Sequence, residues 1–278
     1  MKKLILASLL SLVTLASAQA DLISQWDFNR DADGNLPNAT SPAASFGSGT
    51  ASLFGGVNAT GDGYASGQSE GRSSDPANIA AGSPLGNNGW QINSGWNPGG
   101  SSLSQGVQFS VSTVRFLDDV VVSWDLRQSD TSSRFSAFQY TQNGSDWATI
   151  TDPTLITIGT NPSTGGVGSV TTGGLLTRTF GNRWLNQNTV DLSGLVGAGN
   201  PNFAFRILAA HDPNGNTFVQ TDDGSSPISA TGTWRFDMVT VSGTAVPEPT
   251  SMALLAVAGL GGLIARRFRK KASPAVSA

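Results

Sequence analysis

The sequence contains no cysteine, a single histidine and few charged residues. Without cysteine the chain forms no disulfide, no thiolate metal site and no cysteine nucleophile, so its stability must come from its own core. The single histidine, His211, is the only candidate base for a Ser-His-Asp triad, and no G-x-S-x-G elbow accompanies it. No pair of carboxylates stands out for glycoside hydrolysis. We therefore expect a non-enzymatic protein, with a secreted hydrolase as the alternative.

Lysine is absent from the whole middle of the chain. The only lysines are Lys2, Lys3, Lys270 and Lys271, which excludes a G-x-x-x-x-G-K nucleotide loop. Residues 21–245 hold nine arginines against seventeen aspartates and one glutamate, a net charge of −9. A body with this charge repels phosphates, so we expect no nucleic-acid partner.

Glycine, in contrast, is abundant, with 34 residues beside 13 prolines. This composition is typical of many turns that join short strands. Four stretches alternate apolar and polar residues with a period of two: "LISQWDFN" at 22–29, "DVVVSWDLR" at 119–127, "NFAFRILAA" at 202–210 and "TWRFDMVTVSG" at 233–243. Such half-buried strands need a second layer. They predict an all-β, two-sheet, jelly-roll-like sandwich with long Gly/Ser/Asn-rich loops as one domain over residues 21–245.

The alternation also predicts which side chains face the core. In the last strand it places Trp234, Phe236 and Met238 on one face. Asn143 and Gly144, within "FSAFQYTQNGSDWATI", can supply the positive φ angles of a tight turn, which predicts a hairpin. The strands "FAFRI" and "WRFDMVTVSG" resemble those of laminin-G-like and carbohydrate-binding jelly rolls, a resemblance that implies a binding domain.

The first twenty residues, "MKKLILASLLSLVTLASAQA", differ from this body. They combine a cationic start, an apolar run and small residues at Ala18 and Ala20, the pattern that signal peptidase reads. We expect a signal peptide over residues 1–20, cleavage after Ala20 and export of the body. The alternative is an uncleaved membrane anchor, although the apolar run is short for one.

The other end of the chain, "VPEPTSMALLAVAGLGGLIARRFRKK" at 246–271, combines three features in order. Pro247 and Pro249 keep the segment around Glu248 extended. The 16 residues 250–265 are apolar, and as one helix of about 24 Å they would cross a membrane only marginally. A basic cluster follows, which by the positive-inside rule leaves the tail at 272–278 in the cytoplasm and the body outside. This cluster comprises Arg266, Arg267, Arg269, Lys270 and Lys271.

The order of VPEP, a glycine-containing apolar run and a basic cluster at 246–271 closely resembles the PEP-CTERM sorting signal. This signal is also known as an ice-binding protein C-terminal domain, a name that carries no implication of ice binding here. The resemblance implies that an exosortase of a Gram-negative, polysaccharide-producing bacterium recognises Pro247, Glu248 and Pro249. It implies a transient inner-membrane anchor followed by delivery to the cell surface or the matrix of a biofilm. The alternative is a plain single-span anchor.

Two tryptophans lie in loop-like sequence, "NNGWQINSGWNPGG". Exposed rings of Trp90 and Trp96 could stack on the apolar faces of sugars, which makes them candidate glycan-binding residues. The alternative is that each ring anchors a glycine-rich loop to the core.

Acidic loop residues raise the question of calcium. "DADGN" begins like a calcium loop, but Leu36 and Pro42 replace the glycine and the glutamate that an EF-hand needs. A looser calcium site is predicted from four aspartates, with solvated loop residues as the alternative; these are Asp27, Asp31, Asp33 and Asp237. Taken together, the sequence predicts an exported, non-enzymatic surface or matrix protein that associates with extracellular polysaccharide, with calcium as a candidate cofactor.

Overall fold

The computed structural model describes residues 20–29, 35, 37–65, 88–161, 168–222 and 224–246. The chain divides into two units, 1–244 and 245–278. The predicted signal peptide, the apolar run at 250–265 and the basic cluster lie outside the described residues, apart from Ala20. Among the residues that are described, no helix is long and apolar enough to span a membrane.

The first unit is built from two antiparallel sheets. Sheet A has eight strands: β10 (Ile156–Thr157), β13 (Arg183–Asp191), β7 (Val121–Gln128), β15 (Trp234–Gly243), β1 (Asp21–Trp26) and β2 (Phe46–Gly47) in that order, with β5 (Asn88–Ser94) beside β15 and β4 (Asn58–Ala65) beside β5. Sheet B has seven strands: β11 (Gly168–Val170), β12 (Leu176–Arg178), β8 (Phe135–Thr141), β14 (Ala204–Ala210), β6 (Gly106–Val111) and β3 (Gly49–Phe54), with β9 (Ala148–Thr149) beside β8. The described helical structure is one 3-10 turn, Pro153–Leu155.

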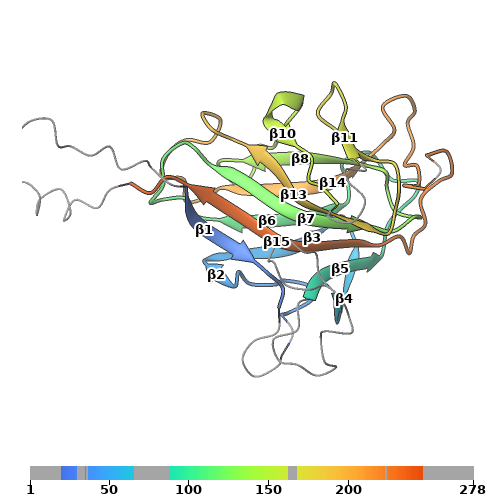
Figure 1. The fold of residues 1–278 in the computed structure, drawn as a ribbon, viewed down its shortest axis with the longest axis horizontal. Coiled ribbons are helices and arrows are strands. Elements are labelled where there is room, and N and C mark those ends of the chain that lie inside the picture. The colour runs from blue at the N-terminus through green and yellow to red at the C-terminus, as the bar shows by residue number, and fades with distance from the viewer. Residues whose placement is uncertain are drawn as a thin grey trace, which may run out of the picture. The chain divides into compact units, whose positions relative to one another are not determined.

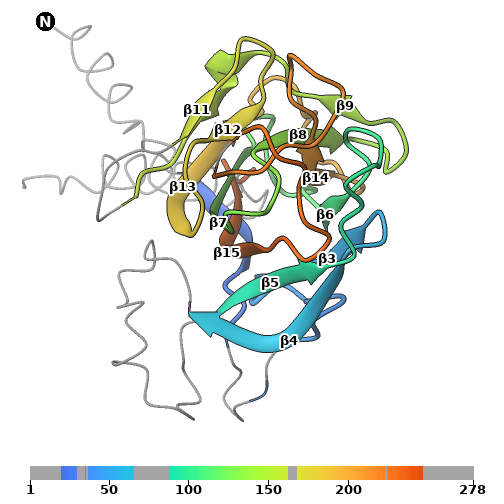
Figure 2. The same cartoon turned by 90° about the vertical axis from the view of Figure 1, so that its right-hand side faces the viewer.

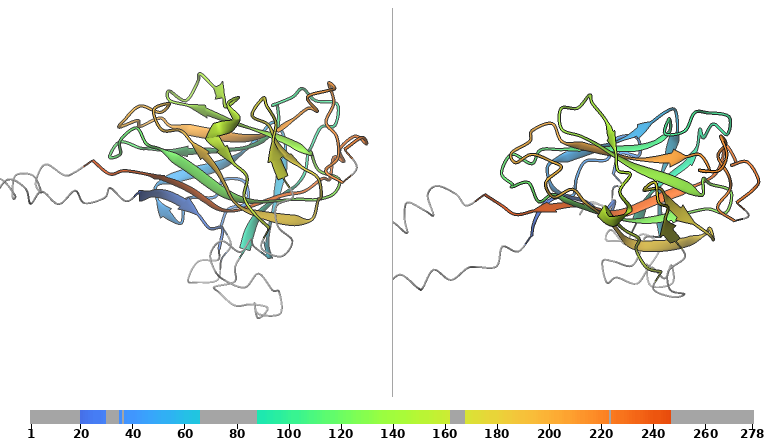
Figure 3. Two further views of the ribbon diagram at one scale, coloured as in Figure 1. Left: turned by 45° about the horizontal axis from the view of Figure 1, so that its top comes forward. Right: turned by 90° about the horizontal axis from the view of Figure 1, so that it is seen from above.

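The two sheets face each other as the layers of a sandwich (Figures 1 and 2). The chain passes repeatedly from one sheet to the other, because β6, β7 and β8 alternate between sheets B and A, as do β13, β14 and β15 (Figure 3). The first and last strands, β1 and β15, pair directly. The prediction of an all-β, two-sheet sandwich is confirmed.

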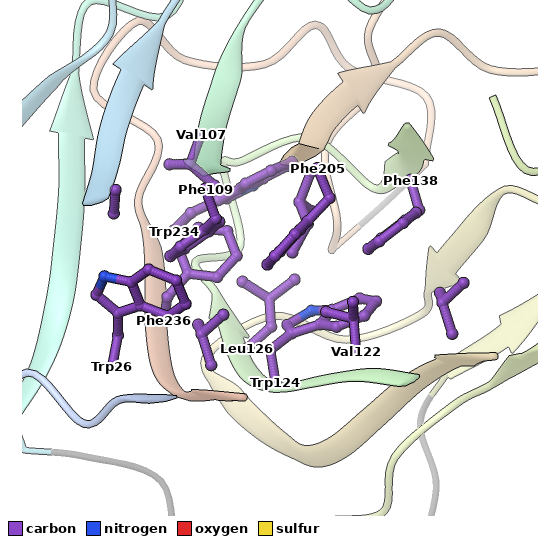
Figure 4. Packing of buried hydrophobic residues seen from close by; sticks show 14 of the residues in the cluster. Trp26, Val107, Phe109, Val122, Trp124, Leu126, Phe138, Phe205, Trp234 and Phe236 are labelled. Carbon is purple, nitrogen blue, oxygen red and sulfur yellow. The ribbon is translucent and has the colours of Figure 1, made fainter. Parts of the chain in front are cut away.

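Aromatic rings fill the space between the sheets (Figure 4). Phe109 and Phe205 of sheet B stack with ring centroids 4.9 Å apart, and Phe205 stacks on Phe138 at 5.5 Å. Phe138 in turn stacks at 5.7 Å on Trp124 of β7, across the sandwich. The predicted core faces are therefore correct here; buried are Val120, Val122, Trp124, Leu126, Phe203, Phe205 and Ile207. Every described strand and the described core lie before Ala245, so the body carries its own core.

The last strand departs from strict alternation. Trp234 and Phe236 are buried as predicted, but Met238 is partly exposed and Val239 is fully buried. The reason is a β-bulge between Asp237 and Thr240 relative to β7, where Met238 adopts a positive φ of 46°. One extra residue reverses the facing of all later residues in the strand. The prediction that Met238 faces the core is wrong.

One charged side chain crosses the sandwich. Arg178 of β12, in sheet B, donates hydrogen bonds to the carbonyl oxygens of Leu126 and Arg183 in sheet A. Burial lowers the pKa of Arg178 to about 9, because the low-polarity interior disfavours its charge. The two carbonyl groups thus compensate the buried charge of Arg178, and these hydrogen bonds link β12 of sheet B to β7 and β13 of sheet A.

Candidate functional site

The two tryptophans predicted to bind sugars lie in the core. Trp90 is 4% exposed and Trp96 is 3% exposed. The Trp90 indole N–H donates to the carbonyl of Ala39 (2.7 Å) and its ring stacks on Phe28, while Trp96 packs on Trp234. Trp90 lies in β5 as the register partner of Phe236 in β15, whereas Trp96 follows shortly after the end of β5. The prediction of an exposed sugar-stacking pair is wrong, and the loop-anchoring alternative describes both residues.

The predicted calcium ligands are placed only in part. Asp31 and Asp33 lie outside the described residues, and Asp27 accepts a hydrogen bond from the N–H of Asn29 at 3.1 Å. In the part of the chain that is described, no three His, Cys, Asp or Glu side chains gather as a metal site would require. Calcium binding thus stays a prediction.

Asp237 has a structural role in the sheet. It pairs in register with Asp125 of β7, and both side chains are buried. Asp237 accepts the N–H of Met238 and Asp125 accepts the N–H of Gln187, both at 2.8 Å. Met238 and Gln187 are the positive-φ residues of bulges on either side of β7. Each carboxylate therefore caps a backbone donor that the ladder leaves without a carbonyl.

His211 also has a structural environment. One ring nitrogen, Nε2, lies 3.0 Å from the carbonyl oxygen of Gly100, and the ring packs edge-on against Phe218. Its backbone N–H donates to the hydroxyl of Ser102. These contacts attach the loop before β6 to the end of β14.

A polar row crosses the outer face of sheet B. Five side chains from β9, β8, β14, β6 and β3 are register partners in turn: Thr149, Gln139, Arg206, Gln108 and Ser52. Within this row Gln139 donates to the hydroxyl of Thr149 at 3.0 Å. The Nε of Arg206 donates to the side-chain oxygen of Gln108 at 2.8 Å. All five residues of the row are partly exposed.

Two aromatic rings enclose the guanidinium at the centre of this row. The Arg206 Cζ lies 4.0 Å from the ring centroid of Phe54 and 3.6 Å from that of Trp147. Phe54 comes from β3 and Trp147 precedes β9, on opposite sides of β14. The cation is thus held between two π faces, an arrangement that is worth more where water is partly excluded. We call Phe54, Gln108, Gln139, Trp147, Thr149 and Arg206 the Arg206 platform.

Two local features of the chain adjoin the rings. The β8–β9 hairpin predicted at Asn143-Gly144 is present, but its loop spans 142–147 and, of that pair, Gly144 alone has a positive φ, 80°. Asn143 instead accepts the N–H groups of Ser145 and Asp146 through its side chain. On the other side, Gly106 is the register partner of Phe54 and adds no side chain to the face.

The charge of Arg206 has no acidic partner within the described residues. Asp146, next to Trp147 in sequence, is instead bonded to Asn143 at 2.6 Å. Burial lowers the pKa of Arg206, because the rings remove part of its hydration. The platform therefore presents a partly dehydrated cation whose terminal nitrogens are left for a ligand.

Sequence reasoning missed all six residues of this platform. Arg206 lies in a stretch that was predicted as a strand, and Trp147 lies in the sequence of the predicted hairpin. Their contact depends on which strands are neighbours, which the sequence pattern does not give. A lone arginine that alternates with apolar residues in a core strand, as in "FAFRI", is the signal that could have indicated it.

The body ends in a fixed position at Thr244. Its backbone N–H donates to Asp119 at 2.8 Å, its hydroxyl donates to the same carboxylate, and its carbonyl accepts the N–H of Leu117 at 2.9 Å. The adjacent Gly243 pairs with Asp21, so the first residue after the predicted signal peptide starts β1. Gly243 is also the last residue of β15, the final strand within the described ranges.

Residues 245–270 match the PEP-CTERM protein-sorting motif. The match confirms the resemblance, with bounds one residue earlier than the sequence features suggested. The PEP-CTERM motif implies an exosortase as the processing partner and membrane-associated sorting to the cell surface. The sandwich lies outside the matched residues, and no functionally curated protein matches the chain.

The contacts at Thr244 predict a pH-dependent stability. Burial alone would raise the pKa of Asp119. The hydrogen bonds from Thr244 outweigh this effect and leave the pKa below the ordinary value of 3.8. The folded chain therefore binds fewer protons than the unfolded chain in acid, so this contribution is present above pH 3.8 and is lost as the pH falls through the folded value. Asp119→Asn should lower the free energy of unfolding by about 1 kcal/mol at pH 7.

Urea unfolding of both proteins from pH 7 to pH 3 measures this effect. The difference between wild type and Asp119→Asn should shrink in acid. A difference that is the same at all pH values would contradict the role given to the carboxylate.

Proposed function

We propose that this chain is a non-enzymatic cell-surface or matrix protein that associates with extracellular polysaccharide through the Arg206 platform. The sorting motif supports surface delivery. The observation that carries the binding proposal is the platform itself, with two half-buried rings around a cation and a row of side-chain amides and hydroxyls on an open sheet face. Aromatic rings with a few placed polar groups are the usual chemistry of sugar recognition.

The rest of the outer face of sheet B is covered by other parts of the chain, unlike the platform. A second small cluster of Phe135, Ala137, Ala210 and Val219 packs there with Leu103. Loops close over this region, and the His211–Gly100 contact fixes one of them. Sheet B therefore offers a ligand the strip across Arg206 rather than its whole outer surface.

The test is co-sedimentation of residues 21–245 with the extracellular polysaccharide of the host, for wild type and for Trp147→Ala. Loss of one stacking ring should weaken retention about fivefold to tenfold. Trp184→Ala is the matched control, because Trp184 is a partly exposed tryptophan of β13 in sheet A. Equal retention of all three proteins would contradict the platform as the binding site, and no retention of wild type would contradict polysaccharide binding.

Calcium support of this binding is a further part of the proposal. The same experiment with calcium and with a chelator tests it. Retention that the chelator abolishes would support a calcium site formed by the aspartates predicted from the sequence. Retention that persists would contradict calcium support, and the platform would then account for binding without calcium.

The alternative function is a secreted hydrolase on the same sandwich. It requires an activity that disappears with one residue, so His211→Asn and single aspartate substitutions test it. A matrix role should be insensitive to His211, whose ring contacts a backbone carbonyl and Phe218.

A further inference from the structure

We propose that the platform selects acidic polysaccharides, with Arg206 binding sugar carboxylate groups end-on through Nη1 and Nη2. This inference rests on the proposed polysaccharide association and names the class of ligand. It begins with the hydrogen bonds of the guanidinium. Gln108 takes the Nε–H of Arg206 at 2.8 Å, so the side of the guanidinium that includes Nε is used within the protein.

The rings limit the approach to the guanidinium. The ring centroids of Phe54 and Trp147 lie 4.0 and 3.6 Å from Cζ, so two rings pack closely against Arg206. Because Nε is bonded to Gln108, the polar edge that is left for a ligand is the one formed by Nη1 and Nη2. A planar fork matches the two oxygens of a carboxylate, and little side-chain freedom is left to lose on binding.

The charge of Arg206 attracts an anion to the platform, whereas the net charge of the body repels anions. Within the described ranges no carboxylate pairs with Arg206, and its partial burial strengthens any ion pair that forms there. The body as a whole has a net charge of −9 over residues 21–245. This charge repels polyanions in general, so retention of an acidic polymer must come from a local site.

Polar neighbours extend the site beyond one charge. Gln139, which is a register partner of Arg206, holds the hydroxyl of Thr149 at 3.0 Å. On the other side Gln108 also reaches toward Ser110, at 3.4 Å. Amides and hydroxyls in a line through the cation suit the hydroxyls of sugar units next to a carboxylated one.

The experiment uses one polymer in two forms. Residues 21–245 are co-sedimented with the extracellular polysaccharide of the host, and with the same polysaccharide after its carboxyl groups have been reduced to alcohols. Wild type should bind the native polymer at least tenfold more tightly than the reduced one. This arm needs no protein variant, so it stands whether or not a substitution disturbs folding.

Variants identify the residue. Arg206→Gln should weaken binding to the native polymer about tenfold to a hundredfold, and should leave binding to the reduced polymer unchanged. Arg206→Lys should restore part of the loss, because it keeps the charge but not the fork. Arg115→Gln, in an exposed loop, is the control that removes the same charge elsewhere.

The outcomes separate this inference from the function it rests on. Equal binding to both forms of the polymer, or Arg206→Gln binding like wild type, overturns the selection of carboxylates and leaves polysaccharide association intact. Absence of binding to either form overturns both. Loss in Arg115→Gln equal to that in Arg206→Gln would show a general charge effect and would also overturn the assignment.

Discussion

Replacing Glu248 with alanine is expected to leave the chain uncut at its C-terminus and associated with the membrane. Glu248 is the only acidic residue after Asp237 and stands between Pro247 and Pro249. It lies four residues beyond Thr244, where the hydrogen-bonded body ends. An enzyme that reads Pro-Glu-Pro would therefore lose the one charge in its recognition motif while the sandwich stays intact.

Intact mass of the protein from membrane and released fractions measures this effect. Wild type should lack the segment that contains Arg266, whereas Glu248→Ala should retain it. Glu70→Ala replaces the only other glutamate and should be processed like wild type. A mature wild-type chain that still contains Arg266, or normal processing of Glu248→Ala, would contradict exosortase cleavage at this motif.

Replacing Trp124 with alanine is expected to destabilise the body by about 3–5 kcal/mol. Trp124 is fully buried on β7, between β13 and β15, and stacks on Phe138 of the opposite sheet. Its indole N–H has no hydrogen-bond partner among the residues that the structure describes. The cost therefore comes from lost packing and a cavity rather than from a broken hydrogen bond. Trp124→Phe should cost clearly less, because it keeps a ring there and loses no hydrogen bond.

Urea unfolding of residues 21–245 measures both substitutions, with an unchanged slope as the sign that the effect is on stability. Trp147→Ala is the matched control, since Trp147 is partly exposed outside the core and should cost much less. A loss below about 1 kcal/mol for Trp124→Ala would contradict the central place of this ring in the core.

The sequence predicted the parts of the fold that depend on local pattern. Alternation identified β7 and β14 and their inward residues, since a period of two is a direct consequence of strand geometry. It failed at Met238, because a bulge depends on the partner strand and on the carboxylate of Asp237 that caps it. It also left Trp90 open between the surface and the core, because loop-like composition does not show that β5 pairs with β15.

The sequence by itself determined the sorting motif at 245–270, the acidic body without lysine, and the all-β class. These features are contiguous or compositional, so they need no knowledge of which residues meet. Only the tertiary structure decided which residues form the Arg206 platform. Phe54, Trp147 and Arg206 are far apart along the chain, and they form one cluster because β3 and β9 lie on opposite sides of β14 in the same sheet. Strand order is a property of long-range pairing, which side-chain periodicity does not encode.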